Sequence, residues 1–150
     1  MLGVGIDWAE AFHLVALGRP GEGVIQIRRV EHTPVAVAGL VAHIATLEPD
    51  PAEVRVVLET RHGTLVEQLT DAGFTVLPVN PDLVARRRGP ARKKDDAADA
   101  RICCVLALDR YTSLRPLNRL RADLLATFPA ALQIAVGDLA APTVLRLLER

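Results

Sequence analysis

The order of the apolar segments is the feature that most limits what this chain can fold into, because their periodicity changes along the sequence. Three short apolar runs come first, at residues 2–7, 12–17 and 24–31, and short connections separate them. Runs of this length, rich in β-branched residues, predict strands, and their short connections favour an antiparallel meander. From residue 34 onward, apolar residues recur at helical spacing, and helical segments alternate with further short apolar runs.

The second half of the expected fold therefore alternates helix and strand. We expect helices at 34–47, 63–72, 81–88 and 97–108, and strands at 54–58 and 74–79. Thr33 can cap the first of these helices, and Gly73 can end the second. Three strands followed by alternating helices and strands are typical of an α/β fold, in which helices flank a mixed sheet. A short helical segment is expected to follow.

Composition limits the classes of function. The chain has 150 residues, half of them hydrophobic, which suits one domain with a real core. Its formal net charge is zero, so attraction to a polyanion must be local. Aromatic residues make up 3% of the chain, which disfavours base stacking on an aromatic surface, and we expect the only tryptophan, Trp8, to be packed.

Cysteine use and the N-terminal sequence indicate the compartment. Cys103 and Cys104 are adjacent within an apolar helical pattern, so we expect two free, buried thiols, as in a reducing cytoplasm. We see no charged leader or long apolar run at the N-terminus, and no stretch long enough to span a membrane. The prediction is a cytoplasmic protein without a membrane partner.

Two carboxylates close apolar strands. Asp7 follows the first predicted strand, and Glu59 follows the strand at 54–58. Ligands of such sheets gather at the carboxyl ends of the strands. Each acid alone could equally cap a turn or accept loop hydrogen bonds. Close to Glu59, Arg61 and His62 could also reach a site at this edge.

A second group of acids opens the predicted helix at 97–108. Asp95 can cap this helix, and Asp96 and Asp99 lie three residues apart on one face. Spacing alone does not choose between Asp95 and Asp96 as the partner of Asp99. Carboxylates brought this close repel one another unless a cation lies between them, and hard oxygen ligands suit Mg²⁺ or Mn²⁺.

A run of cations precedes these acids. Its members are Arg86, Arg87, Arg88, Arg92, Lys93 and Lys94. Such a run can be a solvated loop, but beside a carboxylate cluster it suits contact with a nucleic-acid backbone. Several carboxylates in one cleft in turn suit metal-dependent phosphoryl transfer.

These motifs resemble those of the DEDD transposases of bacterial insertion sequences. The matching segments are GIDWA around Asp7, VVLET around Glu59, and KKDDAADA at 93–100. The helix motif of that family reads Lys, any residue, Asp, two residues, Asp-Ala. This chain matches it with Lys94, Asp96, Asp99 and Ala100, which leaves Asp95 as the variable position.

The resemblance implies a RuvC-like, ribonuclease-H-like nuclease domain over residues 1–112 and a helical segment over 113–150. It implies that Asp7, Glu59, Asp96 and Asp99 are catalytic metal ligands for Mg²⁺, with Mn²⁺ as a substitute. It also implies DNA at insertion-sequence ends as substrate, a structured guide RNA, and assembly into homodimers or larger homo-oligomers.

The chain departs from the family pattern in two respects. Family members carry a catalytic serine in a second domain, whereas Ser113, the only serine here, lies in no matching motif. The helical segment before Asn118 is also shorter than is usual in the family. We therefore expect a shortened chain that binds nucleic acid and metal but does not complete strand exchange alone.

Two other interpretations stay open. A strand followed by GID also begins actin-like and sugar-kinase ATPase domains, although the WAE that follows lacks a glycine to cradle phosphate. Alternatively, the chain is a non-catalytic nucleic-acid-binding or assembly module whose acids are relics. Metal and nucleotide titrations separate these interpretations.

Overall fold

A central strand organises the sheet. In the computed structural model, which describes residues 1–89, 95–110 and 112–117, every residue of β1 (Leu2–Asp7) is buried. The sheet has the order β3-β2-β1-β4-β5. Its other strands are β2 (Phe12–Arg19), β3 (Gly23–Glu31), β4 (Val54–Leu58) and β5 (Thr75–Pro78). β1, β2 and β3 pair antiparallel, whereas β4 and β5 run parallel to β1, as expected for a meander joined to helix-connected strands.

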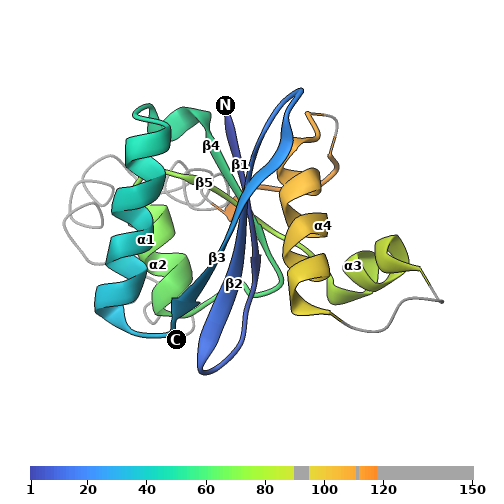
Figure 1. Ribbon diagram of the computed structural model, residues 1–150, viewed down its shortest axis with the longest axis horizontal. Coiled ribbons are helices and arrows are strands. Elements are labelled where there is room, and N and C mark those ends of the chain that lie inside the picture. Colours follow the sequence, from blue (N-terminus) through green and yellow to red (C-terminus); the bar gives the residue numbers. More distant parts are fainter. Residues whose placement is uncertain (90–94, 111, 118–150) are drawn as a thin grey trace, which may run out of the picture. The chain divides into compact units, whose positions relative to one another are not determined.

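Helices cover both faces of this sheet (Figure 1). In the described part of the chain the helices are α1 (Pro34–Leu47), α2 (Thr64–Asp71), α3 (Pro81–Arg88) and α4 (Asp96–Leu108), with a 3₁₀ turn at Pro51–Glu53. α1 and α2 lie on one face, and α4 lies on the other with α3 beside it. Among the described helices, none combines the length and the apolar character that a membrane crossing requires.

The helix boundaries follow from capping residues. Thr33 accepts a hydrogen bond from the backbone N–H of Ala36, and Asn80 accepts one from Asp82. Asp95 caps α4 by accepting from the N–H of Ala97. Each of these bonds satisfies a donor that the first helical turn leaves without a partner. Thr33 and Asp95 confirm the caps predicted from sequence.

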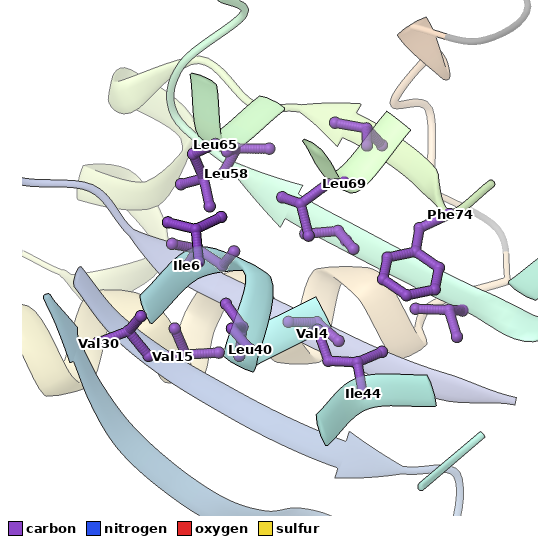
Figure 2. Packing of buried hydrophobic residues seen from close by; sticks show 14 of the residues in the cluster. Val4, Ile6, Val15, Val30, Leu40, Ile44, Leu58, Leu65, Leu69 and Phe74 are labelled. Atoms are coloured by element: carbon purple, nitrogen blue, oxygen red, sulfur yellow. The ribbon is translucent and has the colours of Figure 1, made fainter. Parts of the chain in front are cut away.

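The larger core lies under α1 and α2. Val4 and Ile6 of β1 point into it, where they meet Leu40 and Ile44 of α1 (Figure 2). The helix α2, the strand β4 and the residue just before β5 add further side chains to this cluster, including Leu58, Leu65, Leu69 and Phe74. This apolar layer fixes the positions of β1 and β4, the two strands that end at the predicted acids.

On the opposite face, α4 lies directly on β1. A Cβ atom added to Gly5 would overlap the backbone of Ala100 and Cys104, so only glycine allows this approach. Cys103 and Cys104 are both buried and free, as predicted. The helix that carries Asp99 is thereby held against the strand that carries Asp7.

The expected order of elements and the mixed sheet are confirmed. The compact unit that contains them spans Met1–Leu117. The predicted division at residue 112 stays a prediction, and residues 118–150 of the predicted helical segment lie outside the described part.

Candidate active site

Asp7 and Glu59 lie side by side at one edge of the sheet. β1 and β4 are parallel, and Ile6 pairs with Leu58, so the next residues on the two strands are Asp7 and Glu59. Asp7 is only 8% exposed, and Glu59 is half-buried. The sequence prediction placed both acids at strand ends, and the register adds that they occupy neighbouring positions.

Asp99 reaches the same region from α4. It is 2% exposed, and it lies one residue before Ala100, whose backbone packs on Gly5. All three acids affect the pKa of the thiol of Cys103, which lies one turn further along α4. Burial raises the pKa of this thiol first, and the charges of Glu59, Asp7 and Asp99 raise the pKa further. Since charge effects weaken with distance, all three carboxylates lie near enough for their charges to act on Cys103.

Asp96 occupies a different environment. It is exposed in the first turn of α4, next to the capping residue Asp95, and it is not among the groups that act on Cys103. The structure thus brings together Asp7, Glu59 and Asp99 and places Asp96 on the solvent side of the same helix.

An arginine neutralises Asp99. Nε of Arg88 donates to Oδ1 of Asp99 at 2.8 Å, and Nη2 donates to Oδ2 at 3.0 Å. Such bidentate hydrogen bonding is the strongest form of arginine–carboxylate pairing. Arg88 comes from the last turn of α3, so the ion pair also ties α3 to α4.

The donor chemistry of this cluster fits a hard divalent cation, because its members are carboxylates. Their present arrangement is not closed around an ion. Within residues 1–89, 95–110 and 112–117, no three His, Cys, Asp or Glu side chains are near enough to share one. Arg88 supplies the positive charge beside Asp99 instead. Asp7, Glu59 and Asp99 are therefore the residues that would hold a metal, after Asp99 separates from Arg88.

Cations and apolar side chains line a cleft between α3 and α4. Its volume is about 320 Å³, and its lining comprises Arg87, Arg88, Ala98, Arg101, Ile102 and Val105. Arg86 and Arg87 are exposed, whereas Arg88 is engaged with Asp99. The remaining predicted cations, Arg92, Lys93 and Lys94, lie outside the described residues.

A second, larger cleft opens beside Glu59. It measures about 550 Å³ and is lined by Trp8, Glu59, Thr60, Arg61, His62, Val79, Asn80 and Pro81. Arg61 and His62, which sequence placed near this edge, thus share a cleft with Glu59. Trp8, which was expected to pack, contacts the rings of His13 and His32, and 41% of its surface remains exposed.

Sequence reasoning also missed a pair of histidines behind Trp8. Nε2 of His13 lies 2.8 Å from Nδ1 of His32, although 19 residues separate them. No spacing signal could have paired them, because their contact arises from the pairing of β2 with β3, in which His13 is opposite Val30.

Comparisons of the sequence with known proteins point to transposases. The model of the IS110-type DEDD transposase family, described as "Transposase", matches residues 4–130. The y4uE protein of Sinorhizobium fredii, named as a transposase, is 30% identical over 179 residues, covering 95% of this chain and 49% of that protein. The mini-circle protein of Streptomyces coelicolor, named as a transposase for IS117, is 32% identical over 117 residues, covering 75% and 28%. The chain thus spans about half the length of the first relative and less of the second.

Comparisons of the structure point to one fold. A Thermus thermophilus RuvC in complex with a Holliday junction substrate aligns with a TM-score of 0.54 and 15% identity, over 78% of this chain and 99% of that one. A second Thermus thermophilus RuvC structure aligns with a TM-score of 0.50 and the same identity. This likeness confirms the RuvC-like, ribonuclease-H-like mixed sheet.

Proposed function

The chain belongs to the DEDD transposase family, and from this premise we propose that it carries the metal-dependent phosphoryl-transfer site of a DNA transposase. The substrate in this proposal is DNA at the ends of an insertion sequence. A structured guide RNA and assembly into a homodimer or larger homo-oligomer belong to the same proposal, on the resemblance of the DEDD motifs alone.

The observation that carries the proposal is that Asp7 and Glu59 occupy neighbouring positions at one edge of the sheet, while the buried Asp99 lies on α4, which packs directly on β1. Three carboxylates from β1, β4 and α4 in one poorly solvated region repel one another, so the cluster favours a bound cation. When bound, Mg²⁺ or Mn²⁺ would polarise the phosphate and activate the attacking oxygen. The protein's own task is to hold the carboxylates, which the parallel register of β1 and β4 and the packing of α4 on Gly5 accomplish.

In the same proposal, Asp96 lies on the more exposed side of the site. From the first turn of α4 it can approach a metal only on the solvent side of Asp99. We therefore expect Asp96 to be a ligand that joins when DNA and metal are both bound, and Asp7, Glu59 and Asp99 to form the permanent part.

The DNA backbone would lie along the cationic cleft between α3 and α4. Arg87 and Arg101 line this cleft, and Arg86 is exposed next to it. With a net charge of zero, the chain offers no general attraction for DNA, so these local cations must supply it. Arg92, Lys93 and Lys94 belong to the same proposed backbone contact.

A nicking assay tests the proposal. The purified chain, supercoiled DNA and Mn²⁺ are expected to give weak nicking, which Asp7→Asn and Asp99→Asn abolish and Asp96→Asn reduces. The matched control is Asp71→Asn, which removes an exposed carboxylate at the end of α2. Nicking that survives Asp7→Asn and Asp99→Asn would overturn the assignment.

One observation favours a second candidate, a non-catalytic nucleic-acid-binding or assembly module. The ion pair with Arg88 already neutralises Asp99, so this carboxylate needs no metal to balance its charge. Mn²⁺ titration separates the two candidates, because a relic site binds no Mn²⁺ while DNA binding persists. Membership of the transposase family argues against the kinase-type ATPase alternative.

A further inference from the structure

The only tryptophan of the chain is exposed beside the candidate active site. Trp8 directly follows Asp7, and 41% of its surface faces solvent, although the neighbouring His13 is fully buried. An indole is a large apolar group with a polar N–H, so its exposed surface beside a cleft is suited to contact with a ligand.

The exposed indole rests on a support of two histidine rings. Trp8 stacks on His13, with a centroid distance of 6.3 Å and an interplanar angle of 28°. His32 contacts the indole edge-on at 6.2 Å and also meets His13 edge-on at 4.9 Å. These are the preferred geometries of aromatic pairs, so the two histidine rings hold the indole while 41% of the residue's surface stays exposed.

Hydrogen bonds fix this support. The backbone N–H of Ala9 donates to Nδ1 of His13 at 3.3 Å, which makes that nitrogen an acceptor. Nε2 of His13 therefore carries the proton and donates to Nδ1 of His32 at 2.8 Å. The backbone N–H of His32 also donates to the carbonyl of Ala11, so both ends of the turn that carries Trp8 are tied down.

The exposed indole faces a cleft large enough for a nucleotide. Trp8 shares the cleft of about 550 Å³ with Glu59, Arg61 and Asn80. Ligand pockets in proteins run from roughly 300 to 1,000 Å³. Arg61 can meet a phosphate and Asn80 a base edge or sugar, while Glu59 belongs to the carboxylate cluster.

We propose that Trp8 is a stacking platform for an unpaired nucleobase of bound DNA, next to the phosphate at the carboxylate cluster. This inference rests on the proposed function. Every base has a π face, so stacking tolerates any sequence, and a preorganised indole loses little freedom on binding. A duplex keeps its bases stacked on one another, so the platform selects a strand that is unpaired at this point.

Because Trp8 is the only tryptophan, fluorescence excited at wavelengths that the single tyrosine, Tyr111, does not absorb observes this site alone. The folded chain, with Mg²⁺, is titrated with a single-stranded thymidine oligonucleotide and with an abasic deoxyribose-phosphate strand of equal length. Stacking predicts that the thymidine strand quenches the indole emission strongly at saturation, and that the abasic strand binds with little quenching. Equal quenching by both strands overturns the inference.

Variants test the contribution of stacking to affinity, measured by the anisotropy of labelled DNA. Trp8→Ala is expected to weaken single-strand binding by on the order of tenfold and to leave binding of the abasic strand unchanged. Trp8→Phe should restore most of the affinity that Trp8→Ala removes. Ile25→Ala is the matched control, because Ile25 is similarly exposed at 43% but lies on β3.

The outcomes separate this inference from the proposed function. If Trp8→Ala binds both strands as tightly as the parent chain, the platform is refuted while DNA binding stands. If the parent chain binds neither strand, the proposed function and the platform fall together. If Trp8→Ala loses affinity for both strands equally, Trp8 acts by supporting Asp7 rather than by stacking, which also refutes the platform.

Discussion

Arg88 binds Asp99 through two hydrogen bonds, of 2.8 and 3.0 Å, inside the region where a metal ligand was predicted. The sequence assigned Arg88 to a DNA phosphate and Asp99 to a metal, and the structure pairs the two side chains with each other. In the proposed site, metal binding at Asp99 would therefore be coupled to release of Arg88. A released Arg88 would remain at the edge of the cationic cleft, available to a phosphate.

This coupling predicts how Arg88→Met behaves. Without metal, the variant leaves the buried Asp99 without its guanidinium partner, which should lower the free energy of unfolding by about 3 kcal/mol. With Mn²⁺, the melting temperature should rise more in Arg88→Met than in the parent chain, because the metal no longer competes with the guanidinium.

The control for Arg88→Met is Arg29→Met. Arg29 pairs with Glu31 on the surface, where both side chains are more than half exposed, and it lies over the ring of Phe12. Its replacement should cost at most about 1 kcal/mol and leave the Mn²⁺ response unchanged. Equal responses of the Arg88 and Arg29 variants to Mn²⁺ would rule out the coupling.

Gly5→Ala should displace α4 from β1. The added methyl group would overlap the backbone of Ala100 and Cys104, which cannot rotate away as a side chain can. We expect the free energy of unfolding in urea to fall by at least about 3 kcal/mol, at the upper end of overpacking costs. Alkylation of the buried thiols Cys103 and Cys104 should become faster.

Gly39→Ala serves as the opposite case. Gly39 lies within α1, and a Cβ atom there meets no atom within 4 Å. This substitution should stabilise the chain by about 0.5–1 kcal/mol, because alanine favours the helix. If Gly5→Ala were as well tolerated, the close approach of α4 to β1 would be wrong.

Much of the fold was predictable because local signals agree with it. The apolar residues of β1 and the caps Thr33 and Asp95 mark boundaries that tertiary packing does not override. Parallel strands then bring Asp7 and Glu59 to one edge, which follows from the order of the elements alone.

Other features depend on contacts that no local pattern encodes. Arg88 and Asp99 are 11 residues apart and belong to different helices, so their pairing requires the packing of α3 on α4. The exposure of Trp8 likewise depends on His13 and His32, which come together only through strand pairing. The sequence predicted the same role, that of a metal ligand, for Asp96 and Asp99. The orientation of α4 buries only Asp99 and leaves Asp96 exposed.

His13 makes stability depend on pH. Burial lowers the pKa of His13 to about 4, with a further contribution from His32, against an ordinary value of 6.5. The folded state therefore binds fewer protons than the unfolded state between these values. The contribution of neutral His13 to the free energy of unfolding is complete above pH 6.5 and is lost as the pH falls towards 4. Over this range the free energy of unfolding should fall by at most about 1.4 kcal/mol per pH unit on account of His13.

Comparison of His13→Leu with the parent chain isolates this effect, because carboxylates titrate in both. Urea unfolding between pH 6.5 and 4 should show a shallower decline of stability in His13→Leu. His62→Leu, the matched control, removes an exposed histidine of the Glu59 cleft. Parallel curves for all three proteins would exclude His13 as the source.

Arg86 and Arg87 should bind the DNA backbone without regard to sequence. Both are exposed in the last turn of α3, and Arg87 lines the cationic cleft. Replacing both with alanine should weaken binding equally for unrelated DNA sequences. The slope of log affinity against log salt should become shallower by about 0.9 for each phosphate that the protein no longer neutralises.

The charge-matched control replaces Arg28 and Arg29 of the edge strand β3 and should leave that slope unchanged. A weakening confined to one DNA sequence, or a salt slope that the Arg86 and Arg87 substitutions do not alter, would place the DNA elsewhere on the chain.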